Sequence, residues 1–285
     1  MAEAYCLRNT LITAPSGRSI PAEALRDALK QQPGTRAVFS TLCETSTGVL
    51  EDIEGYAKLT RTGDTLLIVD TVSGLAADRF EMDAWGVDVA VSGSQKGLMI
   101  PPGLAFVAAS PKAAAAQKKS NLPKYYFDLA LYEKALGDDD SPFTPALGLI
   151  LALREALKRI MTEGYDTFLK RAAGLAEATR KGVTAMNLRL FAECPSNAVT
   201  SVVSPEGVDS KKLVKMMRDE LGVTMAGGQS ELAGKIFRIA NMGYITAQDL
   251  EAGFQALEQA LKKLGVNVPS EAGIAAFKRA AEAWR

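Results

Sequence analysis

The chain has 285 residues, which is enough for one large domain or two modest ones. Hydrophobic residues make up 47% of it, so a sizeable core can form, and 33 Lys and Arg balance 33 Asp and Glu. The absence of net charge argues against a nucleic-acid-binding protein, because non-specific binding to polyanions depends on a basic surface.

Other absences narrow the chemistry further. The chain has no histidine, which excludes Ser-His-Asp triads, Cys-His dyads and the usual zinc catalysis. No apolar run is long enough to cross a bilayer, and residues 1–5 do not begin a secretory signal. The three cysteines are too widely spaced for a disulfide framework or a zinc motif. We therefore expect no membrane partner and a reducing compartment, by default the cytoplasm.

Short apolar runs alternate with helical patterns through the first half of the chain. The predicted elements are a strand at 10–13, a helix at 21–31, a strand at 36–41, a short helix at 52–60, and strands at 66–69, 87–91 and 104–108. Strand–helix alternation at these lengths predicts an α/β fold with a mainly parallel sheet that is covered on both faces.

A long helix and a second α/β unit follow. The helix is predicted from about 146 to 163, with Thr144 before Pro145 as its N-cap. Its apolar stripe is expected to be buried and comprises Leu147, Ile150, Leu151, Leu157 and Ile160. The later elements are helices at 165–186, 210–221 and 247–264, strands at 188–191, 199–203 and 235–239, and a tail helix within 270–285. We expect a large domain over 1–162 and a smaller one over 163–285.

Two chemical groups stand out at the ends of predicted strands. The strand at 66–69 leads into Asp70, and the strand at 87–91 leads into a turn of small residues that presents Lys96. Open α/β sheets bind ligands at the carboxyl ends of their strands. Pyridoxal phosphate (PLP) needs both groups, a lysine amine for a Schiff base and an acid at its pyridine nitrogen. Taken singly, each residue is better explained structurally, Asp70 as a turn cap and Lys96 as a surface charge; the two together favour the structural and the PLP explanations equally.

At this point the chain resembles the class V aminotransferases of fold type I, and within them the alanine–glyoxylate and serine–pyruvate aminotransferase group. The resemblance covers nearly the whole chain. The motifs that carry it, in order, lie at 44–49 (ETSTGV), 70–73 (DTVS), 93–97 (GSQKG) with 101–103 (PPG), 143–157, and 235–239 (KIFRI) with 242–243 (MG). No single motif decides the matter, but five in register are strong evidence.

The resemblance implies a role for each of several residues. It makes Lys96 the catalytic lysine that holds PLP and moves the α-proton, and Asp70 the partner of the pyridinium nitrogen. It places Thr45 near the phenolic oxygen of PLP and Gln95 at the phosphate. Its remaining assignments are Arg238 at the substrate α-carboxylate and Thr144 at the phosphate of the partner subunit, which implies a homodimer that acts on a small amino acid and a 2-oxo acid.

Ordinary structural explanations remain open for most of these residues. Thr45 is also a typical turn hydroxyl, Gln95 a solvent-facing side chain, and Thr144 a helix N-cap. Arg238 lies on an apolar strand, where a buried guanidinium needs a partner, and a structural carboxylate would serve. The glycine pair at 227–228 before Gln229 resembles a loop near the substrate entrance, and by itself it predicts only a turn.

The resemblance does not extend to the N-terminal segment of the family. Members of the group have a longer N-terminal segment, which supplies the glycine- and serine-rich turn for the phosphate and the aromatic residue that stacks on the pyridine ring. We therefore keep two alternatives to an aminotransferase of alanine or serine with glyoxylate or pyruvate. One is an inactive or partner-completed fragment that acts as a non-enzymatic protein. The other is a cysteine desulfurase-like PLP enzyme, which is disfavoured because no cysteine lies in a suitable mobile loop.

Overall fold

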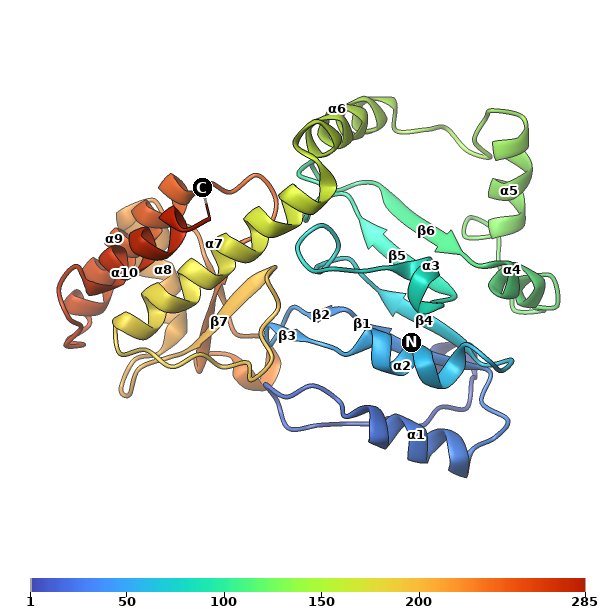
Figure 1. Cartoon of the computed structure of the whole chain (residues 1–285), viewed down its shortest axis with the longest axis horizontal. Helices are drawn as coiled ribbons and strands as arrows, with labels where there is room; N and C mark the ends of the chain where they lie inside the picture. Colours follow the sequence, from blue (N-terminus) through green and yellow to red (C-terminus); the bar gives the residue numbers. More distant parts are fainter. Residues whose placement is uncertain (1, 285) are drawn as a thin grey trace.

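The computed structural model describes residues 2–284, and Figure 1 shows the arrangement of its elements. The helices are η1 (Ala2–Tyr5), α1 (Ala22–Gln31), α2 (Ile53–Thr60), α3 (Met82–Trp85), α4 (Pro111–Gln117), α5 (Leu129–Gly137), α6 (Leu147–Glu163), α7 (Tyr165–Ala185), α8 (Ser210–Leu221), η2 (Ser230–Leu232), α9 (Ala247–Lys263) and α10 (Ala272–Glu282). The strands are β1 (Ala37–Thr41), β2 (Cys43–Glu44), β3 (Val49–Leu50), β4 (Leu66–Asp70), β5 (Val89–Gly93), β6 (Ala105–Ala109), β7 (Val199–Val203), β8 (Ala226–Gly227) and β9 (Ile236–Ala240). Below, the N-terminal unit means the elements up to α6, and the C-terminal unit means those from α7 onward.

The N-terminal unit is built on a four-stranded sheet in the order β1-β4-β5-β6. β1, β4 and β5 are parallel, and β6 closes the sheet as an antiparallel strand. The prediction of a mainly parallel sheet is confirmed. Thr41 pairs with Asp70 and Asp70 pairs with Val91, so the carboxyl ends of three strands form one row.

The two faces of this sheet differ in their cover. On one face Leu67 and Val69 are fully buried in a cluster with residues of α1 and α2. The opposite face carries the row of Phe39 and Thr41, and Phe39 is 67% exposed. The described residues therefore cover one face well and the other only in part, which departs from the prediction of two covered faces.

The C-terminal unit has an antiparallel sheet in the order β7-β9-β8, with α7, α8, α9 and α10 around it (Figure 1). Its core contains Phe237, Leu257 and Phe277, each at most 1% exposed. Thr246 and Asp249 form a capping box at the start of α9, which explains why the helix begins there. The tail helix docks as α10 against α7 and α9.

Several predicted features are corrected by the structure. Residues 10–13 form no strand. Ile12 packs on the core cluster of α1 and α2, and Leu11 is 81% exposed. Residues 188–191 supply only an isolated bridge from Leu190 to Val202. The N-cap of α6 is Ala146 without a side-chain hydrogen bond, so Thr144 is not the cap.

The apolar stripe of α6 is also corrected. Only Ala156 and Ile160 of this helix are buried, while Leu147 is 66% and Leu151 57% exposed. The periodicity correctly predicts an amphipathic helix, but within the described residues nothing covers most of its apolar face. Between residues 2 and 284 no helix combines the length and apolarity needed to cross a membrane.

The two units meet at the hairpin of β2 and β3. Leu50 donates a backbone hydrogen bond to Cys194 O at 2.8 Å, and Ser196 donates one to Gly48 O at 2.9 Å. Gly48 needs its positive φ of 78° here, and a Cβ at this position would lie 2.8 Å from Ser201 Oγ. The segment at 43–50 is thereby bound to the chain that enters β7, and the candidate site lies beside it.

Candidate active site

Asp70 is the last residue of β4, at the carboxyl edge of the parallel sheet. One oxygen of its carboxylate, Oδ1, accepts a hydrogen bond from Val72 N at 2.8 Å. Thr41 Oγ1 donates to the Asp70 carbonyl at 3.3 Å. Asp70 therefore caps the turn that follows it, as one explanation of the sequence expects, and the side chain is still exposed at the sheet edge.

Lys96 lies in the turn that follows β5. Ser94 Oγ donates to Pro101 O at 2.8 Å and accepts from Leu104 N at 3.2 Å, which closes the turn. Gly97 allows a close approach to the segment after Asp70, because a Cβ there would lie 2.1 Å from Leu75 O. The turn that presents the lysine is thus packed against the segment that begins at the aspartate.

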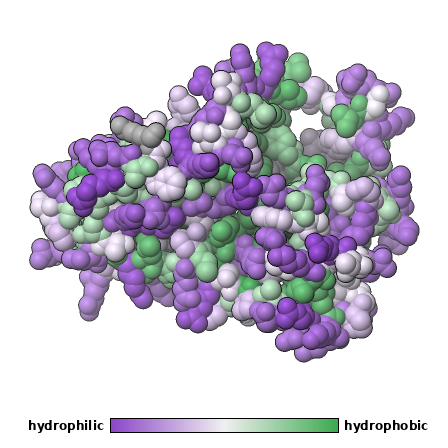
Figure 2. All heavy atoms as spheres, viewed as in Figure 1, coloured by the Kyte–Doolittle hydropathy of each residue, from purple (hydrophilic) through white to green (hydrophobic). Residues whose placement is uncertain are grey.

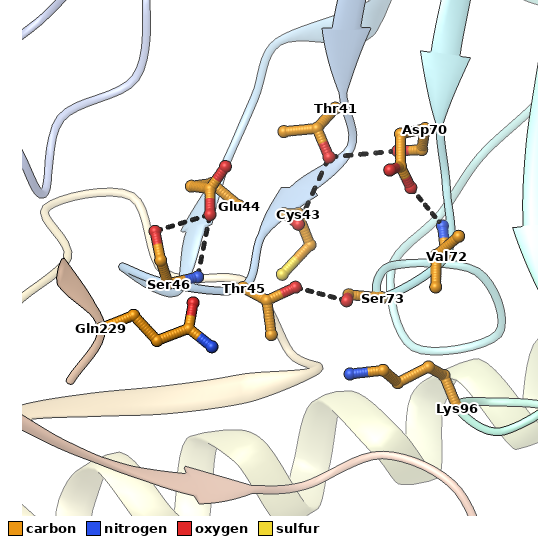
Figure 3. Close-up of a pocket in the computed structure, with 10 residues that line it drawn as sticks. All are labelled: Thr41, Cys43, Glu44, Thr45, Ser46, Asp70, Val72, Ser73, Lys96 and Gln229. Atoms are coloured by element: carbon orange, nitrogen blue, oxygen red, sulfur yellow. Dashed lines mark hydrogen bonds between the residues drawn. The ribbon is translucent and has the colours of Figure 1, made fainter. Parts of the chain in front are cut away.

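Asp70 and Lys96 line the same cavity, which has a volume of about 400 Å³. Figure 3 shows the Lys96 amine pointing into this cavity toward Thr45 and Gln229, with Asp70 on the β4 side. The complete lining comprises Thr41, Cys43, Glu44, Thr45, Ser46, Asp70, Val72, Ser73, Lys96 and Gln229. Lys96 is the only cationic side chain in this lining, and it faces two carboxylates and several hydroxyls.

Hydrogen bonds fix the orientation of the polar lining (Figure 3). The hydroxyl of Thr45 is hydrogen-bonded to that of Ser73, across the cavity wall between β2 and the segment after β4. Glu44 Oε1 accepts from Ser46 N at 2.9 Å and from Ser46 Oγ at 2.6 Å. These bonds organise the cavity wall, because the hydroxyls of Thr45, Ser46 and Ser73 each have a defined partner.

Arg238 lies in the middle of β9 and is 7% exposed. Its Nε donates to Gly227 O at 3.0 Å and its Nη1 donates to Thr45 O at 2.6 Å. The partners of this guanidinium are therefore backbone carbonyls, where the sequence left a structural carboxylate open. Burial lowers the pKa of Arg238, and the nearby Glu44 carboxylate opposes that shift. The structure brings Arg238 to the back of Thr45 without making it part of the cavity lining.

Gln95 and Thr144 lie outside the cavity lining, and both are exposed. The side chain of Gln95 turns toward Gly93, where Oε1 would lie 2.8 Å from an added Cβ. Thr144 lies in the coil that precedes α6. Their roles as phosphate ligands stay predictions.

Sequence reasoning missed part of the cavity lining. Glu44 and Ser46 appeared only as neighbours of Thr45 in a motif, and Ser73 only as the end of the Asp70 motif. Gln229 was noted as the end of a glycine turn. A glutamine after two glycines carries no local signal for a site, since its position depends on how β8 packs against β9.

Cys43 lies on the cavity wall and is 3% exposed. Burial raises the pKa of its thiol to about 12, although the Ser196 hydroxyl beside it acts in the opposite direction. A thiol with so high a pKa stays protonated at neutral pH and is a poor nucleophile. Within residues 2–284, no group of three or more His, Cys, Asp or Glu side chains is placed to hold a metal ion.

The chain is similar to known proteins over most of its length. The sequence model described as Aminotransferase class-V matches residues 6–252. The "Soluble hydrogenase, small subunit" of Synechococcus sp. (strain PCC 6716) is 42% identical, over 97% of this chain and 73% of that protein. The L-aspartate–glyoxylate aminotransferase of Paracoccus denitrificans (strain Pd 1222) is 35% identical, over 97% of this chain and 72% of that protein.

A solved structure agrees with these sequence relatives. The alanine–glyoxylate aminotransferase of Nostoc sp. superposes with a TM-score of 0.87 and 33% identity, over 91% of this chain and 70% of that one. The cavity with its strand-end aspartate and its lysine lies within the matched residues. From the family match, the relatives and the shared fold it follows that the chain belongs to the class V aminotransferases, a family of PLP-dependent enzymes.

Proposed function

We propose that this chain, with PLP bound, transfers the amino group of a small amino acid, alanine or serine, to a 2-oxo acid such as glyoxylate or pyruvate. The observation that carries the proposal is that Asp70 and Lys96 line one cavity in a chain of this family. Glyoxylate is the acceptor named for both the Paracoccus and the Nostoc proteins, and alanine is the donor named for the latter.

The donor set of the cavity fits PLP at two of its ends. A lysine amine suits the aldehyde, and a carboxylate suits a protonated pyridine nitrogen. The volume of about 400 Å³ lies within the range of small-molecule sites. The phosphate end is less complete, because the lining has no cation besides Lys96. We propose that Gln95 and the Thr144 of a second subunit serve the phosphate.

When bound, PLP supplies an electron sink that makes the α-hydrogen of an attached amino acid acidic. Lys96 Nζ points into the cavity (Figure 3), and it would be the base that takes that hydrogen. In the proposed reaction Nζ takes the proton from the substrate Cα and would deliver it to C4′ of PLP. The packing of Gly97 against Leu75 fixes the turn that presents this amine.

Asp70 and Thr45 orient the cofactor. Asp70 commits one carboxylate oxygen to Val72 N, and we propose that the other meets the ring nitrogen and keeps it protonated. The hydrogen bond between the Thr45 and Ser73 hydroxyls supports the proposed contact of Thr45 with the phenolic oxygen. Both roles use a polar group whose orientation the fold has already set.

Arg238 is proposed to bind the substrate α-carboxylate. Its bonds to Gly227 O and Thr45 O use two of the five guanidinium N–H groups, which leaves three for a carboxylate. The planar guanidinium can then form a bidentate, charge-assisted contact that lysine cannot reproduce.

Three further proposals concern the oligomeric state, the domain boundary and the cellular compartment. The exposed apolar face of α6 supports a homodimer. The break at Gly164, which has a φ of 89° between α6 and α7, supports a boundary between domains at 1–162 and 163–285. The three free cysteines support a reducing compartment such as the cytoplasm.

The cysteine desulfurase alternative needs a reactive thiol near Lys96. Cys43 is the cysteine on the cavity wall, and its buried, protonated thiol does not suit nucleophilic attack. The structural likeness to NifS-like proteins, at 17% identity and a TM-score of 0.66, shows a shared fold alone. We therefore keep the aminotransferase as the proposed function.

The proposal is tested by adding PLP to the purified chain and measuring visible absorption and amino transfer. The wild type should gain a visible band, and it should form glycine from glyoxylate with alanine or serine as donor. Lys96→Ala should lose the band and at least about a thousandfold in rate, because the covalent attachment and the base are both removed.

The matched control is Lys118→Ala, which removes an exposed lysine at the end of α4. It should behave as the wild type. A wild-type chain that stays colourless with PLP would favour the non-enzymatic fragment. A holoprotein active only with aspartate as donor would overturn the proposed substrate class.

A further inference from the structure

Asp78 is a buried carboxylate that the proposed reaction does not use. It is 3% exposed and lies outside the cavity lining. Ser196 Oγ donates to its Oδ2 at 2.5 Å, and Asn197 N donates to its Oδ1 at 2.9 Å. A fully buried carboxylate is costly unless it is paired, so contacts this specific indicate a defined role.

These contacts join the two units of the molecule. Asp78 belongs to the N-terminal unit and lies eight residues after Asp70, the last residue of β4. Ser196 and Asn197 belong to the C-terminal unit and precede β7. The partners lie 118 and 119 residues away along the chain. Arg180 of α7 reaches the same place, with Nη1 3.4 Å from Ser196 O.

Further hydrogen bonds connect Ser196 with the end of the strand that carries Arg238. Ser196 Oγ accepts from Ala198 N at 3.0 Å, and Ala198 O accepts from Asn241 N at 3.0 Å. Asn241 directly follows β9, whose Arg238 is paired with Ser201 of β7. A short chain of hydrogen bonds thus connects the segment after Asp70 with the strand that carries Arg238.

The network also touches the cavity wall. The Cys43 thiol lies beside the Ser196 hydroxyl, and Ser196 N donates to Gly48 O at 2.9 Å. Both contacts bind the 43–50 hairpin, which carries Thr45, to the entrance of β7. Asp78 is a buried carboxylate that hydrogen-bonds the residues at this junction.

We propose that Asp78 is a positioning residue that fixes the C-terminal unit against the site, so that Arg238 stays at a set distance from Lys96 and Asp70. The proposal rests on the function proposed above, because Arg238 is there the carboxylate-binding residue. Lys96 and Asp70 belong to the N-terminal unit and Arg238 to the C-terminal unit, so losing Asp78 disturbs substrate binding more than PLP binding.

The kinetic test compares Asp78→Ala, Asp78→Asn and Arg79→Ala in the PLP-loaded chain. Asp78→Ala should raise the KM for the amino donor about tenfold or more, because it leaves Asn197 N and Ser196 Oγ without their partner. Its affinity for PLP should stay within about twofold of the wild type. Asp78→Asn should restore most of the KM, since the amide can accept from Asn197 N and donate to Ser196 Oγ.

Arg79→Ala is the matched control. Arg79 is the next residue, and its Nη2 also bridges the two units, to Asp166 at 3.0 Å. Both side chains are exposed, so the ion pair contributes little and KM should not change. Equal KM values for Asp78→Ala and the wild type would overturn the proposal, and so would a loss of PLP affinity as large as the rise in KM.

Amide hydrogen exchange tests the same claim without catalysis. Asp78→Ala should speed exchange of the amides in residues 43–50 and 236–241, and Arg79→Ala should not. If Asp78→Ala does not fold, Ser196→Ala replaces it, with the same expected result. If the wild type binds no PLP, the proposed function fails while this exchange measurement still decides whether Asp78 fixes the junction; unchanged exchange in both segments would overturn it.

Discussion

The cores of the two units differ in how completely they are covered. In the C-terminal unit, Phe237, Leu257 and Phe277 are at most 1% exposed, in a core where residues of α7, α8, α9 and α10 pack against the sheet. In the N-terminal unit, Phe39 on β1 is 67% exposed and Val107 on β6 is 49% exposed, on the less covered face of the sheet. The C-terminal unit completes its own core, whereas the N-terminal unit leaves apolar surface for something else to cover.

This open surface continues beyond the sheet. Figure 2 shows hydrophobic spheres on α6 at the top of the view and around α5 at the upper right. Leu136 of α5 is 75% exposed, and Phe127 just before it is 82% exposed. Thr41, which lines the cavity, points to the same face of the sheet as Phe39. The candidate site therefore lies on the less covered face of the N-terminal sheet.

Removing one phenylalanine from each unit should show the largest difference in stability between the two cores. Phe277→Ala should cost about 3–5 kcal/mol of unfolding free energy, because it opens a cavity beside Phe254 in a closed core. Phe39→Ala should stay within about 0.5 kcal/mol of the wild type, because its side chain is mostly exposed. Denaturant unfolding measures both. Similar costs for the two variants would show that the contrast between the units is wrong.

A smaller effect is expected at the exposed face of α6. Replacing both Leu147 and Leu151 by lysine should weaken self-association at least about tenfold, because two charges enter an apolar contact. Lys158→Ala, at an exposed polar position of the same helix, is the control. Sedimentation velocity measures the change. An unchanged sedimentation coefficient in the double variant would remove α6 from the proposed dimer interface.

The smallest effect concerns pH and the junction between the units. Burial raises the pKa of Asp78 above its ordinary value of 3.8. As the pH rises above 3.8, Asp78 ionises in the unfolded chain before it ionises in the folded chain. The free energy of unfolding of the wild type therefore falls until the pH passes the raised pKa of the folded state. The charged group facing Asp78 is Arg180, and the Cys43 thiol beside Ser196 remains protonated in this range.

Asp78→Asn lacks this titration while it keeps the hydrogen bonds. The stability of Asp78→Asn relative to the wild type should therefore increase across that pH window and stay constant above it. Urea unfolding at a series of pH values measures the difference. A relative stability that does not change with pH would mean that the carboxylate is not desolvated as the structure indicates.

Local sequence patterns predicted much of the fold. The apolar run before Asp70 became β4, the run before Lys96 became β5, and the helix at 210–221 has the predicted bounds. These elements could be predicted because their apolar patterns and caps lie within a few residues of each other in the sequence. An example is Asp52, which caps α2. The approach of Asp70 to Lys96 followed from the rule that parallel strands share a carboxyl edge.

What the sequence could not predict depends on partners far away along the chain. Residues 188–191 resemble a strand, but their pairing with β7 stops at an isolated bridge between Leu190 and Val202. Gln229 enters the cavity because β8 pairs with β9, and Asp78 meets Ser196 across 118 residues. The exposure of Leu147 was missed because periodicity reports which side of a helix is apolar and says nothing of what covers it.

We propose that the Lys96 amine and the Asp70 carboxylate bind one PLP molecule. The most direct test is to add PLP to the chain, reduce with borohydride, and locate the modified lysine by peptide mass spectrometry. We expect Lys96 to carry the label, and we expect Asp70→Ala to weaken cofactor retention strongly. A label on another lysine, or no label at all, would contradict it.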